Sequence, residues 1–484
     1  MIHLIVLLMV VAVGAPSGEP HTPAWLPEWG RAALESGSDH AALVTPLGFV
    51  AILALYAPAI ALCVRRIDRT GKGGWVRTAD RALLLAQWCT LLWLACCSYA
   101  FGWVGSVRAR TGDLIGVDEA LGIAPAILTL ALLWLLFWPV ERRIRDATRF
   151  GRLASGEPVH PPAGRLGYAG DQLRTHAGPT LISALLLFGW IECVDVLSAR
   201  MSDRLGDAAD AVTIGVLALG SVAIVAVLPV VWRFVWRTRR LPTGELRDEL
   251  TALCERHRVR VADLLVWETR GVLLNGALVG IVPRLRYIML TDALLERLHA
   301  RQVEAVMAHE IAHAKHRHIP WLIATVLVSI GLVSAGVTLA IDGSTDLPDA
   351  WRTGIAAVVS ISGAVLVLGF VSRLFERQAD AFAAQHLALV RTGEDNPGLD
   401  EEDARGMSDA LEGVARFNHI PPDKFSFRHG SIRARQRRLS RLAGVRREDV
   451  PVDGWVRWMK RAVLAGGAAL AFVLWRFPEA GTLL

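Results

Sequence analysis

Long uninterrupted runs of apolar residues dominate the hydrophobic pattern of this chain. A helix needs about 20 apolar residues to cross a bilayer. Eight runs approach that length, at residues 43–64, 82–105, 119–140, 179–198, 211–234, 320–341, 354–372 and 460–476. Tryptophans gather near several of their ends, as in the aromatic belts at membrane interfaces. The pattern therefore predicts a mainly α, polytopic membrane helix bundle.

A shorter apolar run begins the chain, within residues 1–17. It has the length of the hydrophobic region of a signal peptide and ends in small residues before Pro16, but it lacks the usual positive start. A removed signal peptide and a retained short N-terminal anchor both fit this pattern.

Arginine-rich and arginine-poor loops alternate along the chain and predict how the helices are oriented in the membrane. Four segments are rich in arginine, at 65–81, 141–178, 235–319 and 373–459. The segments between them hold few basic residues and several aspartates, at 106–118, 199–210 and 342–353. The positive-inside rule places the arginine-rich segments in the cytosol. The net charge of +6 is thus a topology signal, and we expect no nucleic-acid partner.

The arginine-rich segment 235–319 has the pattern of a mixed α/β domain. Residues 243–257 have helical periodicity, whereas 259–267, 277–282 and 286–290 are rich in strand formers. Asn275-Gly276 is a typical hairpin turn. Thr291-Asp292 can cap the next helix, and residues 302–318 predict one more helix.

That last helix carries an H-E-x-x-H motif, His309-Glu310-Ile311-Ala312-His313. Positions i and i+4 share one face of a helix, so the two imidazoles can bind one zinc ion. Glu310 would then lie beside the metal and act as general base. Two surface histidines on an amphipathic helix would give the same letters.

A catalytic zinc needs a third protein ligand, and Glu376 is the candidate. His313 lies seven residues before the apolar run that starts at 320, and Glu376 lies four residues after the run that ends at 372. Those two runs form a predicted helical hairpin, so both motifs emerge on the same face. Asp380, one turn further, could accept an N–H from a ligand histidine. A solvated, charged helix end is the alternative.

This combination resembles the membrane gluzincins that include the CaaX prenyl protease and the bacterial heat-shock membrane protease HtpX. Five segments between residues 240 and 445 carry the resemblance: LPTGELRDEL, NGALVG, YIMLTDALL, VEAVMAHEIAHAKHRH and SRLFERQADAFA. It implies one zinc ion per chain, with His309, His313 and Glu376 as ligands and Glu310 as catalytic base. It also implies a cytosolic, zincin-like α+β metalloprotease domain joined to the membrane bundle.

The resemblance extends to three further positions. The family has a histidine near the end of the domain, usually followed by proline, with an arginine six residues on. His429 and Arg435 have that spacing, although Gly430 replaces the proline. His429 would stabilise an oxyanion, unless this arginine-rich stretch is only a solvated basic loop. Asn275 corresponds to a position beside an edge strand that lines the substrate cleft.

These observations divide the chain into six parts. We expect a signal peptide or anchor at 1–17, a five-helix transmembrane region at 43–234, a cytosolic protease segment with the H-E-x-x-H motif at 235–319, a transmembrane hairpin at 320–372, a cytosolic segment with the third zinc ligand at 373–459, and a C-terminal apolar helix, expected to span the bilayer, at 460–476.

The expected function is zinc-dependent endopeptidase activity at the cytosolic face of a bacterial inner membrane. Membrane proteins or lipid-modified peptides would be the substrates, in quality control or processing, and the bilayer is the other partner. The sequence leaves the oligomeric state open. Two alternatives stand beside this hypothesis: a catalytically inactive scaffold or substrate-binding protein, and CaaX-type processing of lipid-modified peptides.

Overall fold

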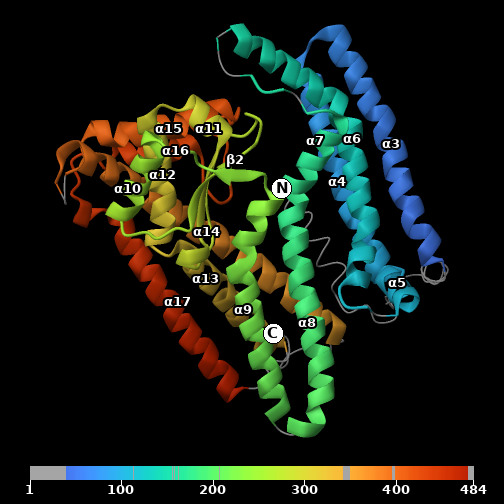
Figure 1. Ribbon diagram of the computed structural model, residues 1–484. Coiled ribbons are helices and arrows are strands. Elements are labelled where there is room, and N and C mark those ends of the chain that lie inside the picture. Colours follow the sequence, from blue (N-terminus) through green and yellow to red (C-terminus); the bar gives the residue numbers. More distant parts are fainter. Residues whose placement is uncertain are drawn as a thin grey trace. The chain divides into compact units, whose positions relative to one another are not determined.

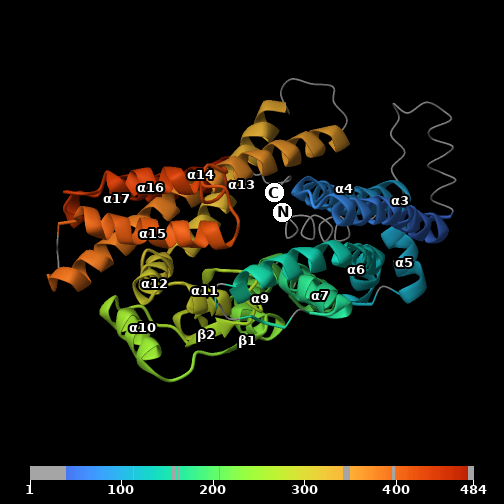
Figure 2. The ribbon, with the colours of Figure 1, turned by 90° about the horizontal axis from the view of Figure 1, so that it is seen from above.

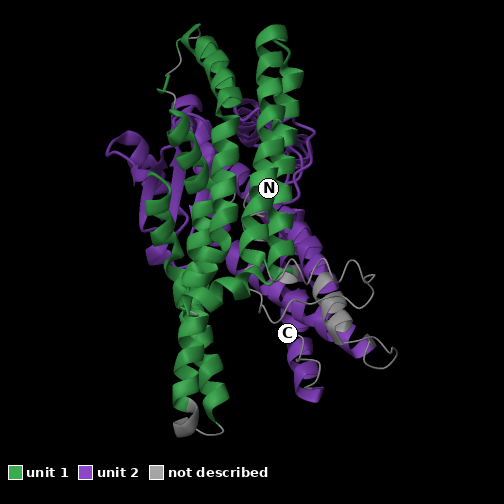
Figure 3. Ribbon diagram, turned by 90° about the vertical axis from the view of Figure 1, so that its right-hand side faces the viewer, with its two compact units in different colours: residues 1–237 green, residues 238–484 purple. Residues whose placement is uncertain are grey.

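A computed structural model describes residues 40–112, 114–154, 156, 159–161, 163–205, 208–341, 349–394 and 398–477 (Figure 1). The chain falls into two compact units, residues 1–237 and 238–484 (Figure 3). Both units are mainly helical, and the second also contains a sheet. The segment predicted as a signal peptide or anchor, 1–17, lies outside the described residues.

Unit 1 is helical throughout its described secondary structure. Its elements are α3 (Ala41–Thr70), α4 (Gly73–Ala100), α5 (Trp103–Thr111), α6 (Val117–Ala154), α7 (Arg165–Gln172), the π-helical turn η1 (Leu173–Ala177), α8 (Gly178–Leu205) and α9 (Ala209–Val235). Helix α6 lies in the core, where Leu130, Leu133 and Trp134 are buried against α3 and α4. Burying such side chains is the dominant stabilising term of a helical bundle in water; within a bilayer, close packing takes that role.

Eight described helical stretches are long and apolar enough to cross a membrane, judged by length and composition. Five belong to unit 1 and three, α13 (His318–Ile341), α14 (Asp349–Thr392) and α17 (Pro451–Arg476), belong to unit 2. Each of the eight predicted apolar runs overlaps one of them. The prediction of a polytopic, mainly α protein is therefore confirmed.

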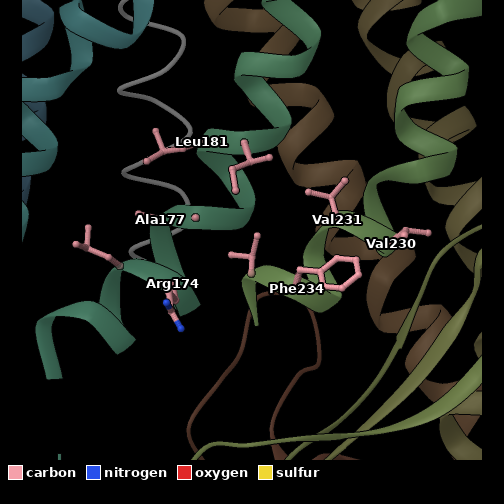
Figure 4. A pocket seen from close by; sticks show the side chains of 10 residues that line it. Arg174, Ala177, Leu181, Val230, Val231 and Phe234 are labelled. Atoms are coloured by element: carbon pink, nitrogen blue, oxygen red, sulfur yellow. The ribbon is translucent and has the colours of Figure 1, made fainter. Parts of the chain in front are cut away.

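Unit 1 also contains a mainly apolar pocket of about 530 Å³ between η1, α8 and α9 (Figure 4). Leu181, Val231 and Phe234 contribute to its lining, and Arg174 is charged. No described residue that lines it is a carboxylate, histidine or cysteine. The pocket thus offers no group suited to metal binding or acid–base chemistry.

Unit 2 is built around a four-stranded sheet (Figure 2). Its strands are β1 (Thr238–Arg240), β2 (Asp263–Trp267), β3 (Gly276–Val279) and β4 (Tyr287–Thr291), in the order β1-β2-β4-β3. Strands β2 and β4 are parallel, and the other two pairs are antiparallel. Strand β3 is therefore an edge strand, with one side of its backbone free of strand pairing.

The predicted hairpin turn at Asn275-Gly276 is wrong. Gly276 is the first residue of β3 and pairs with Leu290. The backbone carbonyl of Asn275 accepts the N–H of Thr291 at 3.0 Å, and its N–H donates to Thr291 Oγ1 at 2.9 Å. These bonds hold Asn275 at the end of the β3–β4 ladder. The actual connection between β3 and β4 runs through Gly280 to Arg286.

The remaining elements of unit 2 are helices. They are α10 (Glu245–Arg256), α11 (Asp292–Arg297), α12 (Ala300–Lys315), α15 (Glu401–Phe417) and α16 (Ile432–Ser440), besides α13, α14 and α17. The helix predicted over 302–318 is divided, because Arg317 adopts a left-handed φ of 57° between α12 and α13. Helix α14 continues without a break from the predicted span at 354–372 into the motif that contains Glu376.

Small side chains let α12 and α14 pack closely. Ala308 and Ala312 of α12 and Ala379 and Ala383 of α14 are completely buried in the core of unit 2. Packed helices approach to about 8 Å when the residues at the contact are small. The contact therefore brings the H-E-x-x-H helix beside the helix that carries Glu376.

Candidate active site

Two histidines and a carboxylate bring one donor atom each to a common point. His309 Nε2 lies 3.3 Å from His313 Nε2. Glu376 Oε2 is 3.5 Å from His309 Nε2, and Oε1 is 3.8 Å from His313 Nε2. Ligands held tetrahedrally at 2.0–2.1 Å from zinc lie about 3.3 Å from one another. The spacing and the chemistry of these donors therefore fit a zinc ion.

A chain of side chains sets the tautomer of His313. Gln378 donates its Nε2–H to Asp453, so Gln378 Oε1 is an acceptor and takes the Nε2–H of His318 at 2.9 Å. The other nitrogen of a neutral imidazole must then accept. His318 Nδ1 accordingly accepts the Nδ1–H of His313 at 2.9 Å. This leaves the lone pair of His313 Nε2 aimed at the metal position.

The second histidine lies against a buried ion pair. His309 Nδ1 lies 3.1 Å from Asp380 Oδ1, although its N–H is not aligned well enough to count as a hydrogen bond. Arg435 in turn donates to both oxygens of Asp380, and its Nη2 lies 3.4 Å from Glu376 Oε2. Asp380 and Arg435, which were predicted separately, thus form an ion pair beside the two donors His309 and Glu376.

The two histidines differ in how they hold a proton. Burial lowers the pKa of His313 to about 3, and the neighbouring His309 adds to this effect. Burial also opposes the charged form of His309, but Asp380 and Glu376 outweigh it and raise the pKa of His309 to about 10. In the metal-free site His309 is therefore a cation at neutral pH, with a proton on both ring nitrogens. Metal binding must release one of these protons.

Glu310 lies on the same helix, between the two histidines. Its Oε2 accepts the backbone N–H of Leu278 in the edge strand β3 at 2.8 Å. Burial raises the pKa of Glu310 to about 7, in spite of the nearby His309 and the bond from Leu278. A carboxylate with a pKa near neutrality is suited to take up and return a proton.

His429 reaches the site from a compact loop before α16. Its Nδ1 lies 3.0 Å from Glu376 Oε1, and its side chain is about half exposed. Gly430 has a φ of +76° and donates its N–H to Ser426 at 2.8 Å. Proline has neither that φ nor an N–H. Gly430 thus has a backbone conformation that proline could not adopt, and the loop brings His429 to Glu376.

A notch in α14 fixes this loop. Phe427 packs so closely on Gly369 that an added Cβ would lie 2.3 Å from its ring. Arg373 also donates to the carbonyl of Phe427 at 2.7 Å. The loop is therefore attached to the same helix that carries Glu376.

Asn275 lies at the start of the edge strand β3, with an exposed side chain. The next residue, Gly276, packs against α12: a Cβ at Gly276 would lie 2.9 Å from Val306 and 3.5 Å from Glu310. The start of β3 is therefore close to the candidate base. Among the described residues, the Asn275 side chain forms no hydrogen bond with a candidate metal ligand.

Three groups that contact site residues or hold their partners in place were not predicted from the sequence. They are the backbone N–H of Leu278, the amide of Gln378 and the carboxylate of Asp453. Gln378 lies two residues after Glu376, but nothing local distinguishes it from a solvated helix residue. Asp453 is 75 residues away from Gln378, so only the fold brings them together.

Parts of the chain are similar to known proteins. The sequence matches Peptidase family M48 over residues 268–393. It is 31% identical to a protease HtpX homolog from Aeropyrum pernix over 190 residues, which are 36% of this chain and 59% of that protein. It is 28% identical to a CAAX prenyl protease 1 homolog from Arabidopsis thaliana over 204 residues, 37% of this chain and 46% of that protein.

These matches thus span about half the length of the curated relatives. Among solved structures, the crystal structure of S. mikatae Ste24p is similar, with a TM-score of 0.45 and 14% identity, covering 83% of this chain and 99% of that one. The matched segment, 268–393, contains all four residues of the H-E-x-x-H and Glu376 set. Over this segment the chain is similar to Peptidase family M48, and it shares this similarity with an HtpX homolog and a CAAX prenyl protease 1 homolog.

Proposed function

We propose that this chain is a zinc-dependent endopeptidase that cleaves membrane-associated proteins at the cytosolic face of the membrane. One observation carries the proposal: His309 Nε2, His313 Nε2 and a Glu376 oxygen converge within 3.8 Å of one another, beside the carboxylate of Glu310. A cluster of two imidazoles and one carboxylate is a typical catalytic zinc ligand set, which leaves a fourth position for water or substrate.

Zinc bound by His309, His313 and Glu376 would supply Lewis acidity toward a water molecule and the scissile carbonyl. Glu310 would act as general base, with one oxygen held by Leu278 N–H and the other free to accept the proton of the water. The same carboxyl group would then donate that proton to the leaving amine. In the metal-free site, burial already raises the pKa of Glu310 above its ordinary value.

Strand β3 would bind the substrate. Because β3 is the edge of the sheet, an extended peptide can pair with the backbone groups on its outer side other than the Leu278 N–H, which Glu310 accepts. That pairing would lay the scissile bond beside Glu310, which contacts β3 at Leu278. His429 is half exposed and adjacent to Glu376. It would donate a hydrogen bond to the negatively charged oxygen that forms when the scissile carbonyl is attacked.

The distribution of arginine along the chain supports the proposed orientation. The arginine-rich segments 235–319 and 373–459 favour the cytosol by the positive-inside rule. Arginine-rich composition is typical of GC-rich bacterial genomes, which favours an inner-membrane location. Quality control or processing of membrane proteins is then the role that suits an active site next to spanning helices.

The alternatives give different outcomes in one experiment. The full chain is purified in detergent as wild type and as Glu310→Gln, loaded with zinc, and incubated with unfolded β-casein and with a reconstituted single-span membrane protein. We expect zinc in both forms and cleavage only by the wild type. A scaffold would bind zinc or substrate without cleavage in either form. Cleavage restricted to a prenylated peptide would favour CaaX-type processing.

A further inference from the structure

A cavity of about 460 Å³ adjoins the candidate active site in unit 2. It lies between the end of β3, the ends of α10 and α12, and the start of α13. One wall includes His313 and Leu278, the residue whose N–H contacts Glu310. The cavity therefore shares one lining residue with the candidate metal ligands and another with the edge strand.

Its lining is unusually basic. Five of the described lining residues are cationic and none is acidic: Arg258, Arg260, Arg286, Lys315 and Arg317. None of these five forms an ion pair within the described part of the chain. Arg286 is tied to the carbonyls of Gly280 and Ile281, and Lys315 lies 3.5 Å from His257. Arg258, Arg260 and Arg317 are exposed, and their side chains form no hydrogen bond or ion pair with another described residue.

Two of these arginines occupy positions that normally favour glycine. Arg258 follows α10 with a φ of 56°, and Arg317 follows α12 with a φ of 57°. Helices often end with a residue in this left-handed conformation, and glycine is the usual choice because a Cβ is unfavourable there. The ends of both helices thus contribute a cation to the lining of one cavity.

Resting on the proposed peptidase function, we propose that this cavity is a subsite for an acidic side chain of the peptide substrate. A peptide paired with β3 advances about 3.3 Å per residue. The cavity wall continues along the chain from Leu278 to Gly280 and Ile281, so a side chain two or three residues from the scissile bond reaches the basic lining. A carboxylate there gains charge-assisted hydrogen bonds with guanidinium groups.

An anionic lipid headgroup is the competing ligand, since α13 begins at the cavity. The position of His313 and the edge strand in the same wall favours the peptide. A lipid headgroup would have no need of contact with the metal ligands or β3. A peptide subsite would make kcat/KM depend on the charge of the peptide. A lipid site would instead make the activity depend on the anionic lipid.

The test begins with cleavage of an equimolar library of unmodified decapeptides by the zinc-loaded full chain, with the cut sites read by mass spectrometry. A matched peptide pair is then made in which one glutamate near the cut is replaced by glutamine. We expect kcat/KM to be about tenfold higher for the glutamate peptide, and this ratio to fall with added salt. The double variant R258N/R260Q should bring the ratio close to one. Asparagine suits the left-handed position of Arg258.

Arg284→Gln is the control, because Arg284 is exposed on the same connection but does not line the cavity. It should keep the wild-type ratio. Equal cleavage of both peptides by the wild type overturns the subsite while leaving the peptidase function standing. A ratio that R258N/R260Q does not change also overturns it. A different result would be that phosphatidylglycerol nanodiscs activate the wild type but not R258N/R260Q, while cleavage does not depend on peptide charge. In that case the cavity binds lipid and the proposal fails. Absence of any cleavage, with zinc bound, refutes the peptidase function itself.

Discussion

Arg435 donates hydrogen bonds to both oxygens of Asp380, at 2.8 and 2.6 Å, and both side chains are buried. Asp380 lies 3.1 Å from the far nitrogen of His309. The ion pair therefore contacts His309, a candidate zinc ligand, on the side of the ring that faces away from the metal position.

Arg435→Met should destabilise the protein and weaken metal binding. The substitution leaves the carboxylates of Asp380 and Glu376 buried without their cation, which typically costs about 3–5 kcal/mol. Thermal unfolding in detergent and zinc affinity measure the two effects. Arg435→Lys should recover part of the stability, and D380N/R435M should be less destabilised than R435M alone. Unchanged stability in R435M would show that the pair has no supporting role.

His318→Phe should lower zinc affinity while preserving the fold. Phenylalanine keeps the stacking on Phe375, where the ring centroids are 4.2 Å apart, but it removes the acceptor for His313 Nδ1–H. Loss of such an outer partner typically lowers metal affinity about 10–100-fold. Chelator competition measures it. His316→Phe is the control, because no side-chain bond to His313 is recorded for it. Equal losses in both variants would contradict the relay.

Stability should fall at acidic pH in a way that depends on His257. Burial, with His386 and Lys315 nearby, lowers the pKa of His257 from 6.5 to about 3. His257 Nε2 also contacts His386, which contacts Glu304. The folded protein then binds fewer protons than the unfolded chain below pH 6.5. The contribution is complete above that pH and is lost as the pH falls toward 3, amounting to about 2 kcal/mol between pH 7 and pH 5.

The measurement is the midpoint of thermal unfolding of detergent-purified protein between pH 7 and pH 5. His257→Gln should flatten the dependence. His419→Asn, at an exposed left-handed position that asparagine tolerates, should leave it as in the wild type. An identical slope in His257→Gln and wild type would contradict the assignment.

The proposed orientation predicts which surface cysteines react in intact cells. Ser440 ends α16 and Asp210 lies in the first turn of α9, and both are exposed. With an impermeant maleimide, Asp210→Cys should be labelled from outside and Ser440→Cys should react only after permeabilisation. The reverse labelling pattern would show that the candidate active site does not face the cytosol.

Much of the site was predictable because its main residues obey local rules. The i, i+4 spacing of His309 and His313 is a helix pattern, and Glu376 follows from counting residues across two apolar runs. Asp380 lies one helical turn further. The structure brings all of them together with Arg435 and His429, although the sequence supports His429 only through a family resemblance.

Long-range and backbone contacts were not predictable from sequence. The bond from Leu278 N–H to Glu310 depends on how the sheet lies on α12, and the seating of Phe427 on Gly369 depends on packing between distant segments. At Asn275-Gly276 the local turn preference was overridden by ladder bonds with Thr291. The break at Arg317 carries neither glycine nor proline, so the sequence indicated one continuous helix.

The central claim is that a carboxylate beyond a helical hairpin completes a metal site begun by two histidines before it. Zinc affinity of the purified full chain tests it directly, by chelator competition in wild type, His309→Ala, Glu376→Ala and the control Glu412→Gln, an exposed carboxylate on α15. We predict one tightly bound zinc in wild type and control, and losses beyond the about 100-fold seen for outer partners in the other two. Wild-type zinc affinity in Glu376→Ala would contradict the account.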